Sequence, residues 1–205
     1  MQRSRGSFRC YRTGNFIPDR SREFLSDAIR FMEKAAYITA SPSGIAEGSV
    51  AMLYENGILV SREGIPTCSH YPQDFVYVER FSMREWAAWY KGICGSELSH
   101  DVPLHWAILV KMARRNPSER QPWAVLHGHS LRTPEDAARL GAPVLLEGGK
   151  RGTMRETEQF EAFLRDKPYP EHKAWLISGH GFFVAEGCVQ SAIEELKRMS
   201  KSSRC

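Results

Sequence analysis

Short segments typical of β-strands, most of them apolar and one with a two-residue period, are interleaved along this chain with stretches that have the three- to four-residue period of an amphipathic helix. Apolar residues recur at helical spacing over residues 22–39, 101–115, 134–140, 154–164 and 190–199. Strand patterns cover residues 49–53, 58–61, 74–81, 122–129, 174–178 and 182–185. Because interleaved helices and strands pack as layers around one sheet, this order predicts an α/β fold with a central sheet.

One pair of these strands is predicted to form a tight hairpin. Residues 49–53 and 58–61 flank the segment Glu55-Asn56-Gly57. An Asn-Gly pair tolerates the positive φ angles that a two-residue hairpin turn requires. The two strands should therefore be antiparallel neighbours.

Length and charge divide the chain into a short tail and one domain. The sequence has 205 residues and no evident repeat or linker, so residues 21–205 are expected to form a single domain. Residues 1–22 carry six of the 28 basic residues and one of the 24 acidic ones, and we expect residues 1–20 to be a flexible basic tail. The nearly neutral remainder lacks the positive field that nucleic-acid binding requires.

Neither a membrane span nor a disulfide framework is predicted. The longest uninterrupted apolar run, Trp106–Val110, is far shorter than the roughly 20 residues that cross a bilayer. The five cysteines are scattered and form no C-x-x-C pair. These features favour a cytoplasmic protein that does not bind membranes.

The strongest local signal for chemistry is the sequence His127-Gly128-His129 at the end of an expected strand. Residues two apart on a strand point to the same face, so both imidazoles can bind one metal ion. The alternative is a pair of histidines at a polar strand edge. A third donor from elsewhere in the chain would favour the metal site.

Two residues could supply further donors. His180 lies between two glycines after the apolar segment 174–178, and Asp101 stands at the expected start of a helix. Asp101 could ligate a metal, act as a general base or cap the helix. Three imidazoles and a carboxylate suit Zn²⁺, with Mn²⁺, Co²⁺ or Fe²⁺ as other candidates. His105, one helical turn after Asp101, could bond near this site or simply pack in the core.

Taken in order, the motifs of this chain resemble the class II aldolase/adducin family over about residues 36–199. The matching motifs are Ile58–Pro66, Leu98–His105, Trp123–Ser130, Arg151-Gly152-Thr153 and Leu176–Val184. The resemblance implies a three-layer α/β/α fold with a central, mostly antiparallel sheet. It also implies a divalent metal, for which we expect Zn²⁺, bound by His127, His129 and His180. Asp101 stands where aldolases of the family have glutamate, and an aspartate there is similar to the epimerase branch, in which it is a metal ligand.

The resemblance implies substrate-binding positions as well, although several of them differ from the family pattern. These positions are Gly48, Ser49, Ser61, Gly64, Ser99 and His100. Glu63 adds a negative charge to a loop that meets phosphate in the family, and Arg62 or His100 could compensate for it. No tyrosine lies between His129 and Gly152 to match the proton donor of the aldolases.

The function implied by the resemblance is that of a carbon–carbon lyase in carbohydrate metabolism. It would cleave a ketose or ketose phosphate in a reversible aldol reaction through a metal-stabilised enediolate, with Asp101 moving the proton. The alternatives are a sugar-phosphate 4-epimerase or dehydratase that uses the same site, and a non-catalytic binding domain of the adducin type. The family also implies a homotetramer whose partner is a small sugar or sugar phosphate.

Overall fold

The computed structural model of the protein describes residues 8–16, 24–35, 37, 39–40, 46–63, 72–93, 95, 97–112 and 121–202. One sheet runs through the molecule in the strand order β1-β6-β5-β4-β3-β7-β10-β9-β8, with β2 paired to β3. All neighbouring strands are antiparallel except the pairs β1–β6 and β8–β9. The strands are β1 (Arg9–Gly14), β2 (Thr39–Ala40), β3 (Ala46–Tyr54), β4 (Gly57–Ser61), β5 (Phe75–Ser82), β6 (Ala87–Lys91), β7 (Ala124–Gly128), β8 (Val144–Leu145), β9 (Ala174–Ile177) and β10 (Gly181–Glu186).

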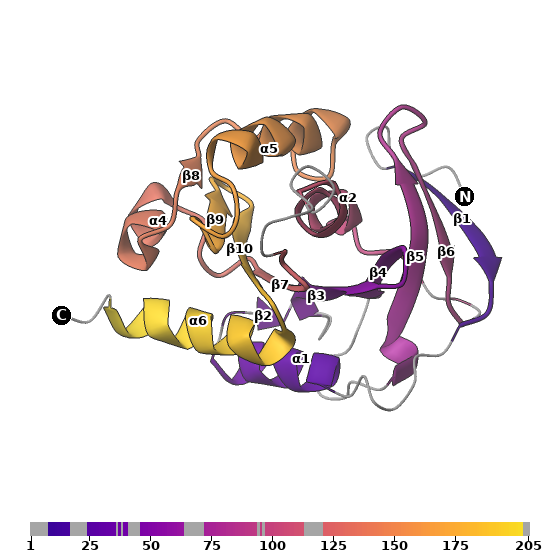
Figure 1. Cartoon of the computed structure of the whole chain (residues 1–205), viewed down its shortest axis with the longest axis horizontal. Coiled ribbons are helices and arrows are strands. Elements are labelled where there is room, and N and C mark those ends of the chain that lie inside the picture. Colours follow the sequence, from indigo (N-terminus) through magenta and orange to yellow (C-terminus); the bar gives the residue numbers. More distant parts are fainter. Residues whose placement is uncertain are drawn as a thin grey trace.

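Helices cover both faces of the sheet (Figure 1). They are α1 (Phe24–Lys34), α2 (Val102–Trp106), α4 (Pro134–Leu140), α5 (Met154–Asp166) and α6 (Val189–Ser202), with a 3₁₀ turn η2 (Pro72–Asp74) and a π-helical segment η3 (Ala107–Met112). Helices α1 and α6 lie on one side of the sheet, whereas α2 and α5 lie on the other (Figure 1). This arrangement confirms the predicted three-layer fold with a mostly antiparallel sheet. Within the described residues, no helix is both long enough and apolar enough to span a membrane.

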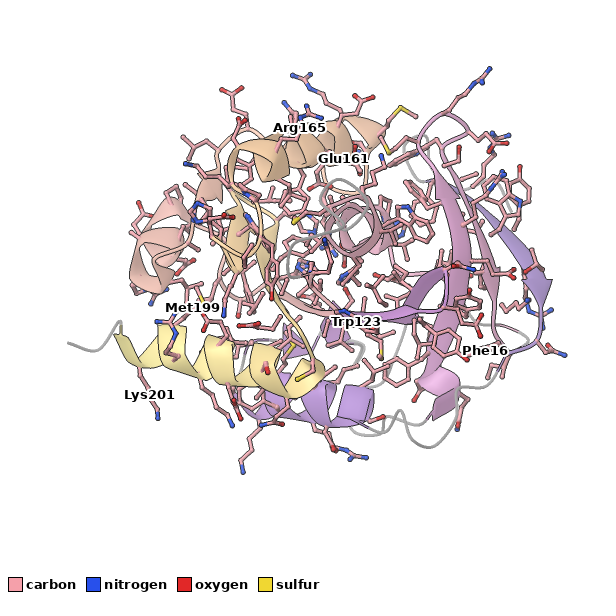
Figure 2. The ribbon with its side chains drawn as sticks, in the orientation of Figure 1. Phe16, Trp123, Glu161, Arg165, Met199 and Lys201 are labelled. Carbon is pink, nitrogen blue, oxygen red and sulfur yellow. The ribbon has the colours of Figure 1, made fainter. Side chains whose placement is uncertain are left out.

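The central strands are buried on both faces, so the protein has a hydrophobic core on each side of the sheet. In β4, Val60 packs into the core beneath α2 and α5, whereas its neighbour Leu59 packs into the core with α1 and α6. Phe183 and Phe182 of β10 divide between the two cores in the same way. Figure 2 shows side chains filling both layers, with Lys201 extending outward from α6. This two-sided burial explains why such strands read as continuous apolar runs.

The predicted hairpin forms, but its glycine has a different task from the expected one. Tyr54 pairs with Gly57, and the positive φ in the turn belongs to Glu55, at 50°. Gly57 is already part of β4, where an added Cβ would lie 2.1 Å from the carbonyl oxygen of Val78. A glycine is therefore required at residue 57 because β5 passes close to it.

The expected basic tail is ordered over part of its length, which corrects the prediction for those residues. Arg9–Gly14 form β1 at the edge of the sheet, parallel to β6. The anchor is Phe8, which is buried and packs edge-to-face against Phe81 and Trp86 at ring-centroid distances of 5.8 and 6.0 Å. The arginine count suggested solvation, but burial of one aromatic side chain and the strand pairing outweigh it. Residues 1–7 and 17–20 of the predicted tail lie outside the described residues.

Helix α2 is more deeply buried than an amphipathic pattern predicts. Every residue from Val102 to Val110 is buried, because α2 and η3 are enclosed between the sheet and α5. The expected helix began at Asp101 and ended at residue 115; residues 113–120 lie outside the described part of the chain. The start of this enclosed helix thus places Asp101 inside the molecule.

Candidate metal centre

Four of the predicted site residues come together in the interior, from three separate parts of the chain. Asp101 precedes α2, His127 lies in β7, His129 follows β7, and His180 occupies the turn between β9 and β10. All four are buried, and one potential ligand atom from each lies within 4.8 Å of the others. The structure therefore joins the H-x-H pair to the two distant donors.

Close approach of β7 and β10 brings these histidines together. A Cβ added to Gly181 would lie 2.4 Å from the carbonyl oxygen of Gly128. It would also lie 3.0 Å from Cε1 of His127 and 3.1 Å from Cδ2 of His129. The glycine after His180 therefore allows the β9–β10 turn to lie directly against the H-x-H pair.

Hydrogen bonding sets the tautomer of His127. Its Nδ1 lies 2.7 Å from the carbonyl oxygen of Phe182, an acceptor, so Nδ1 carries the proton and donates. In the neutral ring Nε2 then has a free lone pair, and this atom lies 2.9 Å from Nε2 of His129 and 3.4 Å from Oδ2 of Asp101. Such outer contacts orient metal-binding histidines in known sites.

His180 is oriented in the same way by Glu156, a buried residue that sequence analysis missed. Oε1 of Glu156 lies 2.5 Å from Nδ1 of His180, and Oε2 accepts a hydrogen bond of 2.7 Å from the amide of Gly152. Nε2 of His180 consequently faces Oδ1 of Asp101 at 3.2 Å. The available signal was Thr153 followed three residues later by glutamate, the pattern of a capping box at the start of α5.

These four residues fit a divalent cation. Ligand atoms around a tetrahedral zinc ion lie roughly 3.3 Å apart, given Zn–N bonds of about 2.0–2.1 Å. Three pairs of converging atoms from Asp101, His127, His129 and His180 have separations of 2.9, 3.2 and 3.4 Å. Lone pairs of neutral imidazoles and carboxylate oxygens repel one another at such distances unless a cation or proton lies between them. The donor set is therefore able to bind a metal ion.

The electrostatics of the site place His129 and Asp101 in the forms that bind metal, whereas His180 must lose a proton when a metal binds. Burial, followed by the proximity of His127, lowers the pKa of the His129 imidazole to about 2. Burial alone would raise the pKa of Asp101, but the adjoining His127 and His180 hold it well below its usual range. Burial opposes protonation of His180, yet hydrogen bonds to Asp101 and Glu156 outweigh it and raise the pKa of His180 to about 9. Without a metal, a proton on His180 takes part of the cation's place.

Hydroxyl groups hold the Asp101 carboxylate toward the histidines. Ser49 and Ser99 each donate to Oδ2 at 3.3 Å, and the side chain of Asp101 makes no capping bond to α2. Nε2 of the buried His105 lies 2.7 Å from Oγ of Ser49, and burial lowers the pKa of His105 to about 3. His105 therefore lies behind Ser49, and it bonds near the site as well as packing in the core.

The remaining predicted substrate residues are distributed unevenly. Gly48 is half-buried in β3 with a φ of 146°, and His100 is exposed next to Asp101. Ser61 is buried, and its hydroxyl oxygen accepts a 3.1 Å hydrogen bond from the amide of Val50, so this oxygen helps to hold β3 and β4 together. Gly64 lies outside the described residues.

Arg62 does not offset Glu63 in the way that sequence analysis suggested. Its guanidinium bonds Oδ1 of Asp74 at 2.9 and 3.2 Å, and the Asp74 side chain is buried. Glu63 is exposed, and its backbone amide donates to the carbonyl of Glu97. The positive charge of Arg62 is thus already paired.

Comparisons with known proteins identify the fold. No protein-family model and no curated protein matches the sequence. Among solved structures, L-fuculose-1-phosphate aldolase from Thermus thermophilus matches with a TM-score of 0.58 at 18% identity, over 88% of this chain and 89% of that one. A sugar-phosphate aldolase from Thermotoga maritima matches with a TM-score of 0.64 at 14% identity, over 91% and 94% of the two chains. The chain has a class II aldolase-like fold.

A third structure of this fold has a broader description. A putative aldolase/epimerase/decarboxylase from Escherichia coli matches with a TM-score of 0.60 at 19% identity, over 90% of this chain and 86% of that one. At such identities the likeness is one of fold alone. Because one fold can carry different reactions, the chemistry of this chain depends on its own buried side chains.

Proposed function

We propose that this protein is a divalent-metal-dependent carbon–carbon lyase that cleaves a ketose or ketose phosphate in a reversible aldol reaction. The observation that carries the proposal is the convergence of one carboxylate and three imidazoles in the interior. Two of these imidazoles have their outer nitrogens held by Phe182 and Glu156, which directs the inner nitrogens into the cluster. The aldolases among the similar structures support the same reaction class.

His127, His129 and His180 would hold the metal, and Zn²⁺ is the ion that this donor set favours. When bound, the ion would polarise a substrate carbonyl and stabilise the negative charge that develops on its oxygen. His127 and His180 hold the pKa of Asp101 below its usual range, which keeps the carboxylate in the ionised form that a base requires and also makes it a weaker base. Hydrogen bonds from Ser49 and Ser99 to one oxygen of Asp101 fix the orientation of this base.

One observation favours a second candidate, a sugar-phosphate 4-epimerase. The two oxygens of Asp101 lie 3.2 Å from Nε2 of His180 and 3.4 Å from Nε2 of His127, which is the spacing of a metal ligand. In the family that the sequence resembles, aspartate as a ligand is a property of the epimerase branch. Product analysis separates the two candidates, since a lyase releases an aldehyde fragment and an epimerase returns a stereoisomer of the intact sugar.

The experiment that tests the proposal is the metal content of the purified protein. The wild type should carry about one Zn²⁺, Mn²⁺ or Co²⁺ per chain, bound in preparation or after reconstitution. His127→Ala and His180→Ala should lose it while circular dichroism shows that they remain folded. His172→Ala is the matched control, because His172 follows α5 and is not among the cluster residues. A loaded wild type justifies a screen for aldol cleavage of phosphorylated and free ketoses.

A folded wild type that cannot be loaded with any of these ions would overturn the enzyme proposal and favour a non-catalytic binding role. Assembly as a homotetramer and a cytoplasmic location also belong to the proposal. Light scattering coupled to size-exclusion chromatography tests the first of these, and cell fractionation tests the second.

A further inference from the structure

Arg151 is a positively charged side chain at the margin of the metal cluster. Its Nη2 lies 3.9 Å from Oδ1 of Asp101, and the Arg151 side chain is 49% exposed. This separation is too long for a hydrogen bond. Within the described residues, no hydrogen bond of the Arg151 guanidinium is found, so its donors are directed to the edge of the cluster without being used there.

Asp101 does not require Arg151 as a partner. Its oxygens already lie within 3.4 Å of the hydroxyls of Ser49 and Ser99 and of the ring nitrogens of His127 and His180. With a divalent cation bound and the imidazoles neutral, the two carboxylates of Asp101 and Glu156 balance the charge of the cation. The guanidinium of Arg151 then leaves one net positive charge at the site. A substrate carrying an anionic group would complement this charge.

The backbone beside Arg151 is anchored to the metal cluster. The amide of Gly152 donates to Oε2 of Glu156, whose other oxygen bonds His180. A Cβ added to Gly152 would lie 3.9 Å from both Cβ and Nδ1 of His100, so the exposed His100 side chain lies alongside this loop. The His100 side chain therefore lies next to the residue that follows Arg151.

In the loop that meets phosphate in the family, the described residues are Ser61, Arg62 and Glu63. Ser61 accepts a bond from the backbone of β3, Arg62 is paired with Asp74, and Glu63 adds a negative charge. An anionic group of the substrate would find unused guanidinium donors at Arg151 but not at Arg62. Among the described residues, Arg151 is thus better placed than Arg62 to bind an anionic group.

We infer that Arg151, with His100 beside it, recognises an anionic group of the substrate, a phosphate monoester or a carboxylate, at the edge of the metal cluster. A guanidinium suits this task because its planar donors bind two oxygens of either group at once. The inference rests on the proposed function in placing the substrate at this cluster. It makes Arg151 a specificity-determining residue, beyond the substrate-binding positions that the sequence resemblance implies.

The test is calorimetric binding of inorganic phosphate and of acetate to the metal-loaded protein and to the metal-free protein. Arg151→Gln should weaken binding of at least one probe about tenfold or more, and Arg151→Lys should weaken it less. Arg155→Gln is the matched control, because it removes the same charge from an exposed position one residue before Glu156. All three variants should retain the metal content and circular dichroism of the wild type.

The two probes distinguish the sources of the anion. Loss of phosphate binding alone identifies a phosphate monoester, and loss of acetate binding alone identifies a carboxylate. Equal effects of Arg151→Gln and Arg155→Gln, or no effect of either, would overturn the inference while leaving the proposed function intact. Loss of metal from Arg151→Gln would also overturn it, because Arg151 would then be part of the cluster's structure. A wild type that binds no metal but shows Arg151-dependent anion binding would refute the proposed function alone.

Discussion

Replacing Glu156 with glutamine should weaken metal binding about 10- to 100-fold, because Glu156 orients His180 from outside the cluster. In the wild type, one carboxylate oxygen accepts from Nδ1 of His180 and the other from the amide of Gly152. Glutamine offers one acceptor oxygen and one NH₂ group in nearly the same shape. Either Nδ1–H of His180 or the amide of Gly152 must then face the NH₂ group of the glutamine, which is also a donor.

The magnitude follows from these two contacts. A loss of 10- to 100-fold in affinity corresponds to about 1.4–2.7 kcal/mol, which is the range for leaving one buried polar group without a partner. Glu156 is 1% exposed and His180 is 4% exposed, so water cannot easily supply the missing acceptor. The ring of His180 should consequently rotate or change tautomer, either of which misdirects Nε2.

The assay is competition for Zn²⁺ against a chromogenic chelator, with circular dichroism to verify the fold. Glu158→Gln is the control, since Glu158 is exposed on the same helix and the substitution removes the same charge. A folded Glu156→Gln protein that binds Zn²⁺ as tightly as the wild type would refute the argument that this carboxylate positions His180.

Three further predictions concern stability and the geometry of the cluster. In the metal-free protein, the pKa of His180 is about 9, against about 6.5 in the unfolded chain. Its protonation should therefore add about 3 kcal/mol to the free energy of unfolding below pH 6.5, and this contribution should be lost as the pH rises through 9. The pKa of His129 is lowered to about 2, so the unfolded chain binds this proton more readily and the fold should lose stability below pH 6.5. Together the two histidines should give the metal-free protein its highest urea midpoint near pH 6.5, and a profile without a maximum would contradict these shifts. Phe8→Ala should cost about 3–5 kcal/mol in urea denaturation by removing the anchor of β1, and a loss below about 1 kcal/mol would mean that β1 does not depend on it. Gly181→Ala should displace the histidines and abolish metal binding even where the variant folds, because its Cβ would lie 2.4 Å from the carbonyl oxygen of Gly128. Unchanged Zn²⁺ affinity would show that β7 and β10 can separate without cost.

Much of the fold could be predicted because periodicity is a local property. The strand patterns around Ile58–Ser61 and Ala174–Ser178, and the helical pattern of residues 154–164, correspond to β4, β9 and α5. The error in the predicted N-terminal tail arises from contacts between residues that are far apart in the chain. Nothing local in the arginine-rich start shows that Phe8 finds a pocket between Phe81 and Trp86, more than 70 residues further along the chain.

In the candidate metal centre too, only the part that depends on local spacing could be predicted. The sequence alone determined the H-x-H pair, because two residues on one face of a strand are neighbours whatever the rest of the chain does. Only the tertiary structure decided that Asp101 meets His180 across 79 positions, and that Ser49 joins His105 across 56. Likewise, only the fold showed that Glu156, which sequence analysis missed, is the partner of the buried His180 imidazole. The physical reason is that hydrogen bonds and metal ligation depend on distances in space, and spacing along the chain fixes those distances only within a single strand, turn or helix.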